Sequence, residues 1–241
     1  MPELVVLNHT AGAGPSAFAE VLDARSGIAP WRAVDVPAGD ALPEDPEGLA
    51  GLVIMGGTMS AVDPAQHAWM PPELDLIRRA VDAEVPVLGV CLGAQLLGQA
   101  FGGEVARREV PEVGFLPLVR TDEGRNDPVV AGWPDHAVAL FVHEDEVVAL
   151  PPDARPVLDG SDGSAAWRLG SALAVQFHPE VTAEQLAAWI DAGLLDDLLG
   201  RAGADGEALV EEARRRDRFT VPLGRALIGR FLDGPVRIRV S

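Results

Sequence analysis

Residues 85–93 read VPVLGVCLG, an apolar run that ends in the only cysteine of the 241-residue chain, Cys91. This pattern predicts a strand over 85–90 that turns sharply into a helix over 92–101, with the thiol at the bend. Gly89 and Gly93 suit such a bend, because its backbone is tight and the helix packs closely behind it. The amino terminus of that helix would point its amides at the sulfur, which favours the nucleophilic thiolate.

Strand-like and helix-like segments alternate through the first hundred residues. Strands are expected at 4–7, 31–36, 52–55 and 85–90, and helices at 16–25, 73–83 and 92–101. Such alternation is typical of an α/β fold, a mostly parallel central sheet with helices on both faces. Between residues 104 and 177, turn residues separate short strand-like runs at 115–120, 137–142, 156–158, 165–169 and 172–177. These runs predict a small antiparallel β element at the edge of that sheet.

The sequence becomes helical after residue 180. Thr182 and Gln185 form a capping-box pattern, which predicts a helix running to about Leu199. Three more elements are expected beyond it: helices at Glu207–Arg216 and Leu223–Leu232, and a strand-like tail at Val236–Val240. The pattern predicts a main domain over residues 1–195 and a C-terminal helical extension over residues 196–241.

Composition narrows the classes of function. The chain has 37 acidic and 19 basic residues and a formal charge of −18, which disfavours nucleic acid and anionic membranes as partners. No apolar stretch is long enough to span a bilayer, and the first residues lack the pattern of a signal peptide. One cysteine forms no internal disulfide, and no His/Cys cluster has zinc spacing. We expect a cytoplasmic protein with no metal and no cofactor.

A second motif could supply the base that a nucleophilic cysteine needs. Residues 176–180 read QFHPE and follow an apolar run. Residues two apart in an extended chain face the same way, so His178 and Glu180 would project together. A carboxylate beside an imidazole fixes its tautomer and stabilises its charged form, which is the division of labour in a Cys-His-acid triad.

A third motif, the glycine pair Gly56-Gly57, also follows an apolar run. Without side chains in the way, backbone amides there could bind the oxyanion of an acyl-transfer intermediate, and the amide of Leu92 would be the second donor. All three motifs follow predicted strands, and ligand sites form where the carboxyl ends of parallel strands meet. Their convergence on one edge favours a catalytic site.

Each of these residues taken alone has a simpler explanation. A lone cysteine is most often an inert buried residue, and a single histidine is often a hydrogen-bonded core residue. A glycine pair can simply turn a strand into a loop. His9, His67 and His136 are expected to be structural or surface residues. Only the combination of the motifs outweighs these explanations.

Together, GVCLGAQ at residues 89–95, the glycine pair and His178-Pro179-Glu180 resemble the signatures of class I, triad-type glutamine amidotransferases. The resemblance covers roughly residues 1–190 and implies a flavodoxin-like sandwich. It implies that Cys91 attacks the carboxamide of glutamine, that a γ-glutamyl thioester forms and that ammonia leaves. His178 would act as base and acid, and Glu180 would orient it.

The same resemblance assigns further positions. Gly57 and Leu92 match the oxyanion-hole positions, and Gly56 and Gln95 match substrate-binding positions. Residues 142–147 resemble the S-H-G-D-x-V stretch of the family, which lines the pocket for the amino-acid end of the substrate. His143 and Asp145 are therefore further candidates for substrate binding, although His143 could simply hydrogen-bond within its own loop.

Glu144 departs from the family pattern, because it stands where the family has glycine. An extra carboxylate at this position would repel the carboxylate of the substrate or attract its ammonium group. It could equally belong to a charged turn on an acidic protein.

Three functions remain open. The first is a glutaminase-type hydrolase that cleaves a γ-glutamyl amide and supplies ammonia to a synthase partner subunit, since residues 196–241 are too few for an acceptor domain. The second is a free-standing hydrolase of γ-glutamyl peptides or γ-glutamyl amines. The third is a catalytically silent binding or regulatory module, against which the intact Cys91, His178 and Glu180 argue. The ligand would be glutamine or another γ-glutamyl small molecule.

Overall fold

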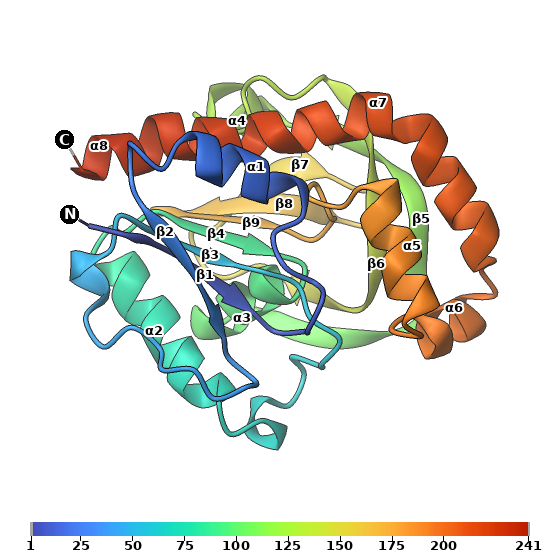
Figure 1. Cartoon of the computed structure of the whole chain (residues 1–241), viewed down its shortest axis with the longest axis horizontal. Helices are drawn as coiled ribbons and strands as arrows, with labels where there is room; N and C mark the ends of the chain where they lie inside the picture. Colours follow the sequence, from blue (N-terminus) through green and yellow to red (C-terminus); the bar gives the residue numbers. More distant parts are fainter. Residues whose placement is uncertain (1, 241) are drawn as a thin grey trace.

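The computed structural model describes residues 2–240, and the strands of that part form one nine-stranded sheet in the order β2-β1-β3-β4-β9-β8-β7-β5-β6 (Figure 1). The strands are β1 (Leu4–Asn8), β2 (Trp31–Asp35), β3 (Gly51–Ile54), β4 (Val87–Val90), β5 (Glu104–Arg120), β6 (His136–Ala149), β7 (Arg155–Asp159), β8 (Ser164–Leu169) and β9 (Ala172–Val175). The strands from β2 to β9 in this order are parallel, and the pairs from β9 to β6 are antiparallel.

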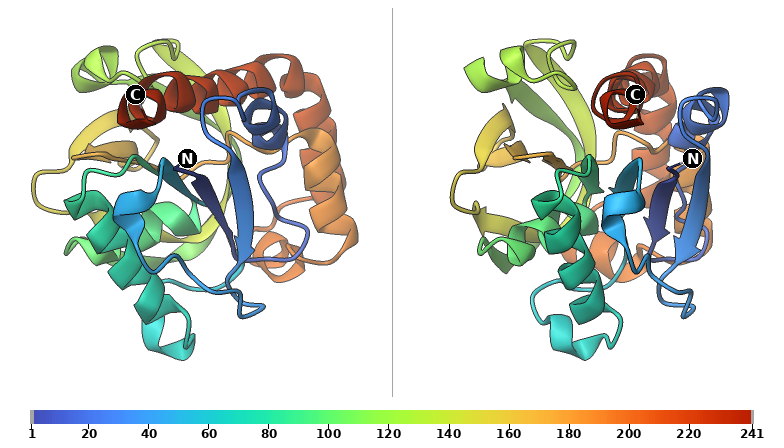
Figure 2. Two further views of the ribbon diagram at one scale, coloured as in Figure 1. Left: turned by 60° about the vertical axis from the view of Figure 1, so that its left-hand side comes forward. Right: turned by 90° about the vertical axis from the view of Figure 1, so that its left-hand side faces the viewer.

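Helices cover both faces of the sheet (Figure 2). They are α1 (Ala17–Ala24), α2 (Met70–Asp82), α3 (Leu92–Ala100), α4 (Asp122–Asn126), α5 (Ala183–Asp191), α6 (Asp196–Ala202), α7 (Gly206–Phe231) and α8 (Arg237–Val240). Successive side chains of β1 point to opposite faces of the sheet. Leu4 and Val6 pack in the core that includes α1 and α7, whereas Val5 and Leu7 pack in the core that includes α2 and α3. The expected α/β class is confirmed.

The antiparallel part is more extensive than the sequence indicated. Strands β5 and β6 form a hairpin of 17 and 14 residues, with a register shift between Arg107 and Glu112. Sequence reasoning found only the apolar halves of these strands, at 115–120 and 137–142. The remaining residues, 104–114 of β5 and 143–149 of β6, include many charged and partly exposed side chains. Apolar periodicity is therefore weak there, and the sequence did not predict a strand.

The C-terminal segment differs from the prediction in three places. The helix that begins after Thr182 ends at Asp191, before Gly193, whose φ is 71°. The two helices expected at 207–216 and 223–232 are one continuous helix, α7, which contains Pro222 and changes direction along its length (Figure 1). A proline removes one backbone donor, but the buried packing of the helix outweighs that loss here.

The tail at Val236–Val240 is helical and not a strand, which is the third difference. A π-helical turn over Leu232–Val236 leads directly into α8. The alternation of valine or isoleucine with arginine suggested a strand, but no sheet edge receives this segment among the described strands. Instead Val236 is fully buried, and Arg239 donates hydrogen bonds to the carbonyl oxygens of Leu49 (2.8 Å) and Glu47 (2.7 Å).

The bend at Cys91 has the predicted strand–turn–helix form. Cys91 lies between β4 and α3 with φ 51° and ψ −105°, a backbone conformation that costs a non-glycine residue about 1–3 kcal/mol. Its amide donates to the carbonyl oxygen of Val175 on β9 (2.8 Å). A Cβ at Gly93 would overlap the carbonyl oxygen of Ile54 and lie 2.9 Å from its carbonyl carbon. Glycine therefore lets α3 approach β3 and hold the strained bend.

Gly93→Ala is expected to lower the free energy of unfolding by about 2 kcal/mol, because the new methyl group would meet backbone that cannot rotate away. Gly200→Ala in α6 is the matched control, since a Cβ there meets no atom within 4 Å. That variant should gain about 0.5–1 kcal/mol from helix propensity. Urea denaturation, monitored by circular dichroism, measures the free energy of unfolding of each variant. Equal changes in the two variants would show that close packing at Gly93 is unimportant.

None of the helices in residues 2–240 is long and apolar enough to span a bilayer.

Candidate active site

The three sequence motifs meet at one edge of the sheet. Strands β3, β4 and β9 are neighbours, and they are followed by Gly56-Gly57, Cys91 and residues 176–180 respectively. A Cβ placed on Gly56 would lie 3.1 Å from Cε1 of His178 and 3.5 Å from Cβ of Cys91. The structure therefore brings the cysteine, the histidine and the glycine pair into contact distance, as their positions after adjacent strands predicted.

His178 and Glu180 form a buried pair. The distance from Nδ1 of His178 to Oε1 of Glu180 is 2.8 Å, and the two residues are 7% and 2% exposed. The loop is fixed at its backbone, because the His178 amide donates to the Leu140 carbonyl (2.8 Å) and the Glu180 carbonyl accepts from the Ala17 amide (3.0 Å). A carboxylate on Nδ1 leaves Nε2 free to face a reacting group.

Charge stabilises the protonated imidazole. Burial by itself lowers the pKa of His178, but the charges of Glu180 and Cys91, and hydrogen bonds to both side chains, outweigh burial. The pKa of His178 is therefore held well above its ordinary value. The raised pKa keeps a proton on His178 next to Cys91, where it is available for transfer.

The glycine loop after β3 is packed tightly against its surroundings. A Cβ on Gly57 would lie 2.8 Å from Cδ2 of Leu92 and 2.8 Å from Cβ of His9. His9 is buried, with Nδ1 3.0 Å from the Met55 carbonyl oxygen and Nε2 3.0 Å from Oε1 of Glu73. The candidate oxyanion positions Gly57 and Leu92 thus lie side by side, and His9 supports the loop from within, as expected of a structural histidine.

A cavity of about 150 Å³ adjoins Cys91. Its walls are the glycine loop at 57–59, residues 142–145 of β6, residues 194–195 just before α6 and residues 197–198 within α6, with Gln95 of α3 also facing it. Gln95 is 3% exposed and its Nε2 donates to the carbonyl oxygen of Asp145 (2.6 Å). Three candidate substrate-binding residues, Gln95, His143 and Asp145, therefore line one pocket beside the thiol, whereas Gly56 lines a separate small cavity with His178.

The side chains of His143 and Asp145 are engaged with the protein itself. Nδ1 of His143 lies 3.0 Å from the Asp145 carbonyl oxygen, and its Nε2 lies 2.8 Å from Oε2 of Glu112. The Asp145 carboxylate accepts from Oγ of Ser60 and from Nε of Arg107 (3.0 Å). Both residues shape the wall of the pocket by joining the glycine loop, β5 and β6.

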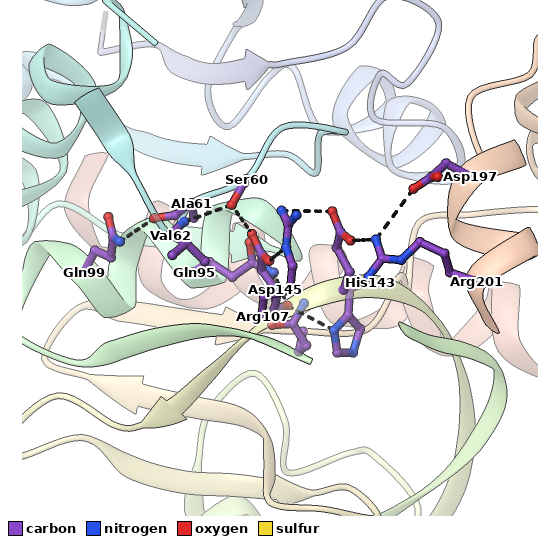
Figure 3. A network of polar contacts seen from close by, with 12 residues as sticks. Ser60, Ala61, Val62, Gln95, Gln99, Arg107, His143, Asp145, Asp197 and Arg201 are labelled. Atoms are coloured by element: carbon purple, nitrogen blue, oxygen red, sulfur yellow. Dashed lines mark hydrogen bonds and ion pairs between the residues drawn. The ribbon is translucent and has the colours of Figure 1, made fainter. Parts of the chain in front are cut away.

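Glu144 pairs with two arginines that sequence reasoning missed, Arg107 and Arg201, both labelled in Figure 3. Arg107 lies 3.0 Å from Oε1 of Glu144, and Arg201 pairs with Oε2. Figure 3 shows Arg201 and Asp197 reaching this network from α6, and their side chains are 3.5 Å apart. The two guanidinium groups reduce the negative charge of Glu144 but do not cancel that of the cluster, because Arg107 also pairs with Asp145 and Arg201 also pairs with Asp197. In the sequence, the only indication of these arginines was Glu144 itself, because a carboxylate in place of the family's glycine favours a cationic partner.

Gln176 is a further residue at the thiol, one to which the sequence motif QFHPE assigned no role. Its Nε2 lies 3.7 Å from Sγ of Cys91, and its Oε1 lies 3.5 Å from Nε2 of Gln95. Trp189 of α5 packs edge-on against His178, with ring centroids 5.5 Å apart. Within residues 2–240, no group of three or more His, Cys, Asp or Glu side chains is arranged to hold a metal ion.

The chain is similar in sequence to known glutamine amidotransferases. The family model described as glutamine amidotransferase class-I matches residues 30–195. The glutamine-hydrolysing GMP synthase of Thermomicrobium roseum is 32% identical over 193 residues, which cover 79% of this chain and 34% of that protein. One of the separate chains of the glutamine-hydrolysing GMP synthase of Methanococcus maripaludis is 40% identical over 107 residues, 43% of this chain and 54% of that one.

Solved structures show the same fold. A glutamine amidotransferase from Thermotoga maritima superposes with a TM-score of 0.84 at 25% identity, covering 97% of this chain and 99% of that one. One from Methylobacillus flagellatus gives a TM-score of 0.83 at 27% identity, covering 97% and 94%. The chain spans about a third of the length of the first curated relatives it matches, 34% and 36%. Since the family model covers more than half of the chain, the protein belongs to the class-I glutamine amidotransferase family.

Proposed function

We propose that the chain hydrolyses the side-chain carboxamide of glutamine through a thioester on Cys91. The observation that carries the proposal is the buried His178, held between Glu180 and Cys91 with a raised pKa. This arrangement places a nucleophile and a proton donor side by side, where both can act on the carboxamide group of the substrate.

The mechanism follows from the roles of these groups. Sγ of Cys91 attacks the carbonyl carbon, and the backbone amides of Gly57 and Leu92 stabilise the oxyanion. His178 gives its proton to the nitrogen, the C–N bond breaks and ammonia leaves. His178 then accepts a proton from water, which attacks the thioester carbonyl, and glutamate is released with the thiolate restored. Glu180 orients the imidazole throughout.

The space near His178 favours a primary amide over a substituted one. The leaving nitrogen must face His178, and the cavity on that side has a volume of only about 50 Å³. Its apolar wall is formed by Val142, Trp189, Leu194 and Leu195. A cavity needs only about 10–15 Å³ of such volume to hold one water-sized molecule, so this space suits ammonia better than a bulky amine. We therefore favour free glutamine over γ-glutamyl peptides or γ-glutamyl amines.

The ammonia needs an acceptor, and we propose that a synthase partner subunit provides it. The relatives from Methanococcus maripaludis and Sulfolobus acidocaldarius are named as single subunits of a glutamine-hydrolysing GMP synthase, which supports a division of labour between chains. Because a thiol nucleophile must stay reduced, we propose the cytoplasm as the compartment.

A series of γ-glutamyl amides tests the proposed substrate. Release of glutamate should be fastest from glutamine, and kcat/KM should fall at least about tenfold for the γ-glutamyl methylamide and further for the butylamide, since added methylenes meet the apolar wall. Cys91→Ala, assayed in parallel, gives the background.

Two other results would contradict the proposal. Faster turnover of the butylamide than of glutamine would identify a free-standing γ-glutamyl amine hydrolase. A folded wild-type protein that releases no glutamate from any amide, and whose thiol does not react with an electrophilic glutamine analogue, would be a silent module.

A further inference from the structure

Helix α7 lies beyond the residues matched by the family model, yet it touches the candidate catalytic loop. The matched region ends at residue 195, and α7 spans Gly206–Phe231. The helix runs along the face of the sheet that also carries α1 (Figure 1). We propose that Gly224 of α7 is a positioning residue, which sets the placement of His178 relative to Cys91 through the backbone of Pro179.

The contact between helix and loop is backbone against backbone. A Cβ on Gly224 would overlap the carbonyl oxygen of Pro179 and lie 2.7 Å from its carbonyl carbon. Real Cβ atoms essentially never approach other heavy atoms this closely, so no residue but glycine fits without movement. Pro179 stands between His178 and Glu180, and its peptide group cannot shift without carrying one of these side chains with it.

The loop has little freedom to yield elsewhere. The amide of His178 is tied to β6 at Leu140, and the carbonyl of Glu180 is tied to α1 at Ala17. Just after the loop, the amide of Ala183 donates to the Asp217 carboxylate of α7 (3.0 Å). The helix therefore fixes the loop at two points, and the sheet and α1 fix it at two others.

Only a small void adjoins this contact. It measures about 10 Å³ and is lined by His178, Pro179 and by Thr220, which lies one turn before Gly224 on α7. That is about the smallest space that can hold one water, so it offers little room for a displaced peptide. A methyl group on Gly224 would thus push the loop and tilt the imidazole away from its place beside the thiol.

The test compares Gly224→Ala with two controls in the same helix. Gly229→Ala adds the same methyl group, but the nearest atom is the flexible end of the Arg25 side chain at 3.3 Å. Leu227→Ala removes a fully buried side chain, which lowers stability without adding any atom beside Pro179. The readouts are kcat and KM for glutamine, and the pH dependence of the rate at which iodoacetamide alkylates Cys91, the only thiol of the chain.

Gly224→Ala should lower kcat at least about tenfold, since a shift of about 1 Å at a catalytic group can cost a hundredfold. KM should change less than about threefold, because the pocket walls at β6 and α6 are untouched. The alkylation rate should fall at neutral pH, where the thiolate depends on the neighbouring imidazolium. Gly229→Ala and Leu227→Ala should keep the wild-type profile while folded.

Several outcomes would overturn the inference. One is a normal kcat and a normal alkylation profile in folded Gly224→Ala; another is an equal loss in Leu227→Ala, which would mean that general stability is responsible. If Gly224→Ala does not fold, Thr220→Leu presses on the same loop from the void, and a wild-type alkylation profile in that variant would refute the proposal. The kcat measurement rests on the proposed function. The alkylation measurement reports on the thiol–imidazole pair even if glutamine is not the substrate.

Discussion

Replacing His178 with alanine is expected to lower kcat for glutamine hydrolysis by about 10⁵-fold or more, as removal of a catalytic base does in comparable triads. We expect a large loss because the proposed mechanism uses this side chain in two steps: it favours the thiolate before attack, and it protonates the leaving nitrogen afterwards. Released ammonia and glutamate, measured at saturating glutamine, give kcat directly. KM should change little, because the pocket beside Cys91 is built from other segments.

The matched control for this variant is His136→Ala. His136 is exposed at the start of β6, so its loss removes an imidazole of the same kind without touching the site. It should keep wild-type turnover. Circular dichroism should show that both variants remain folded. Turnover within tenfold of wild type in folded His178→Ala would remove this histidine from the mechanism, and would leave the geometry around Cys91 without its proposed proton donor.

The motifs of the candidate site were predictable because they are local. A cysteine between glycines after an apolar run, and a histidine two residues before a glutamate, each imply a geometry within a few residues. Their convergence followed from one general rule, that the carboxyl ends of neighbouring parallel strands share an edge. The same locality explains why α3 and the strained bend at Cys91 were predicted to within one residue at the helix end.

The rest of the site depends on contacts between segments that are distant in the sequence. Nothing near Glu144 in the chain shows that Arg107 and Arg201 pair with it, because Arg107 lies in a strand before it and Arg201 in a helix well after it. Helix α7 was predicted as two pieces because Pro222 breaks local propensity, while the buried packing that overrides it is tertiary. Gly224 is likewise an ordinary helical glycine until Pro179 is seen beside it.

Replacing Glu180 with glutamine is expected to lower kcat by about 10³- to 10⁴-fold, because the amide no longer holds the imidazole in the required tautomer. The variant should also change the pH profile. The carboxylate charge helps to raise the pKa of His178, so its removal lowers that pKa. The imidazolium is then lost at lower pH, and the alkaline limb of kcat/KM should move toward acid, whereas the wild-type limb lies well above the ordinary histidine value.

Glu184→Gln is the control for this change, since Glu184 is exposed in the first turn of α5 and lies four residues further along the chain. It should leave both kcat and the alkaline limb unchanged. An unshifted limb in Glu180→Gln, with normal turnover, would mean that the 2.8 Å contact with Nδ1 has no part in catalysis. A large loss of kcat with an unshifted limb would mean that Glu180 acts by orienting the ring alone, because a charge effect on the pKa of His178 must move the limb in the acid direction.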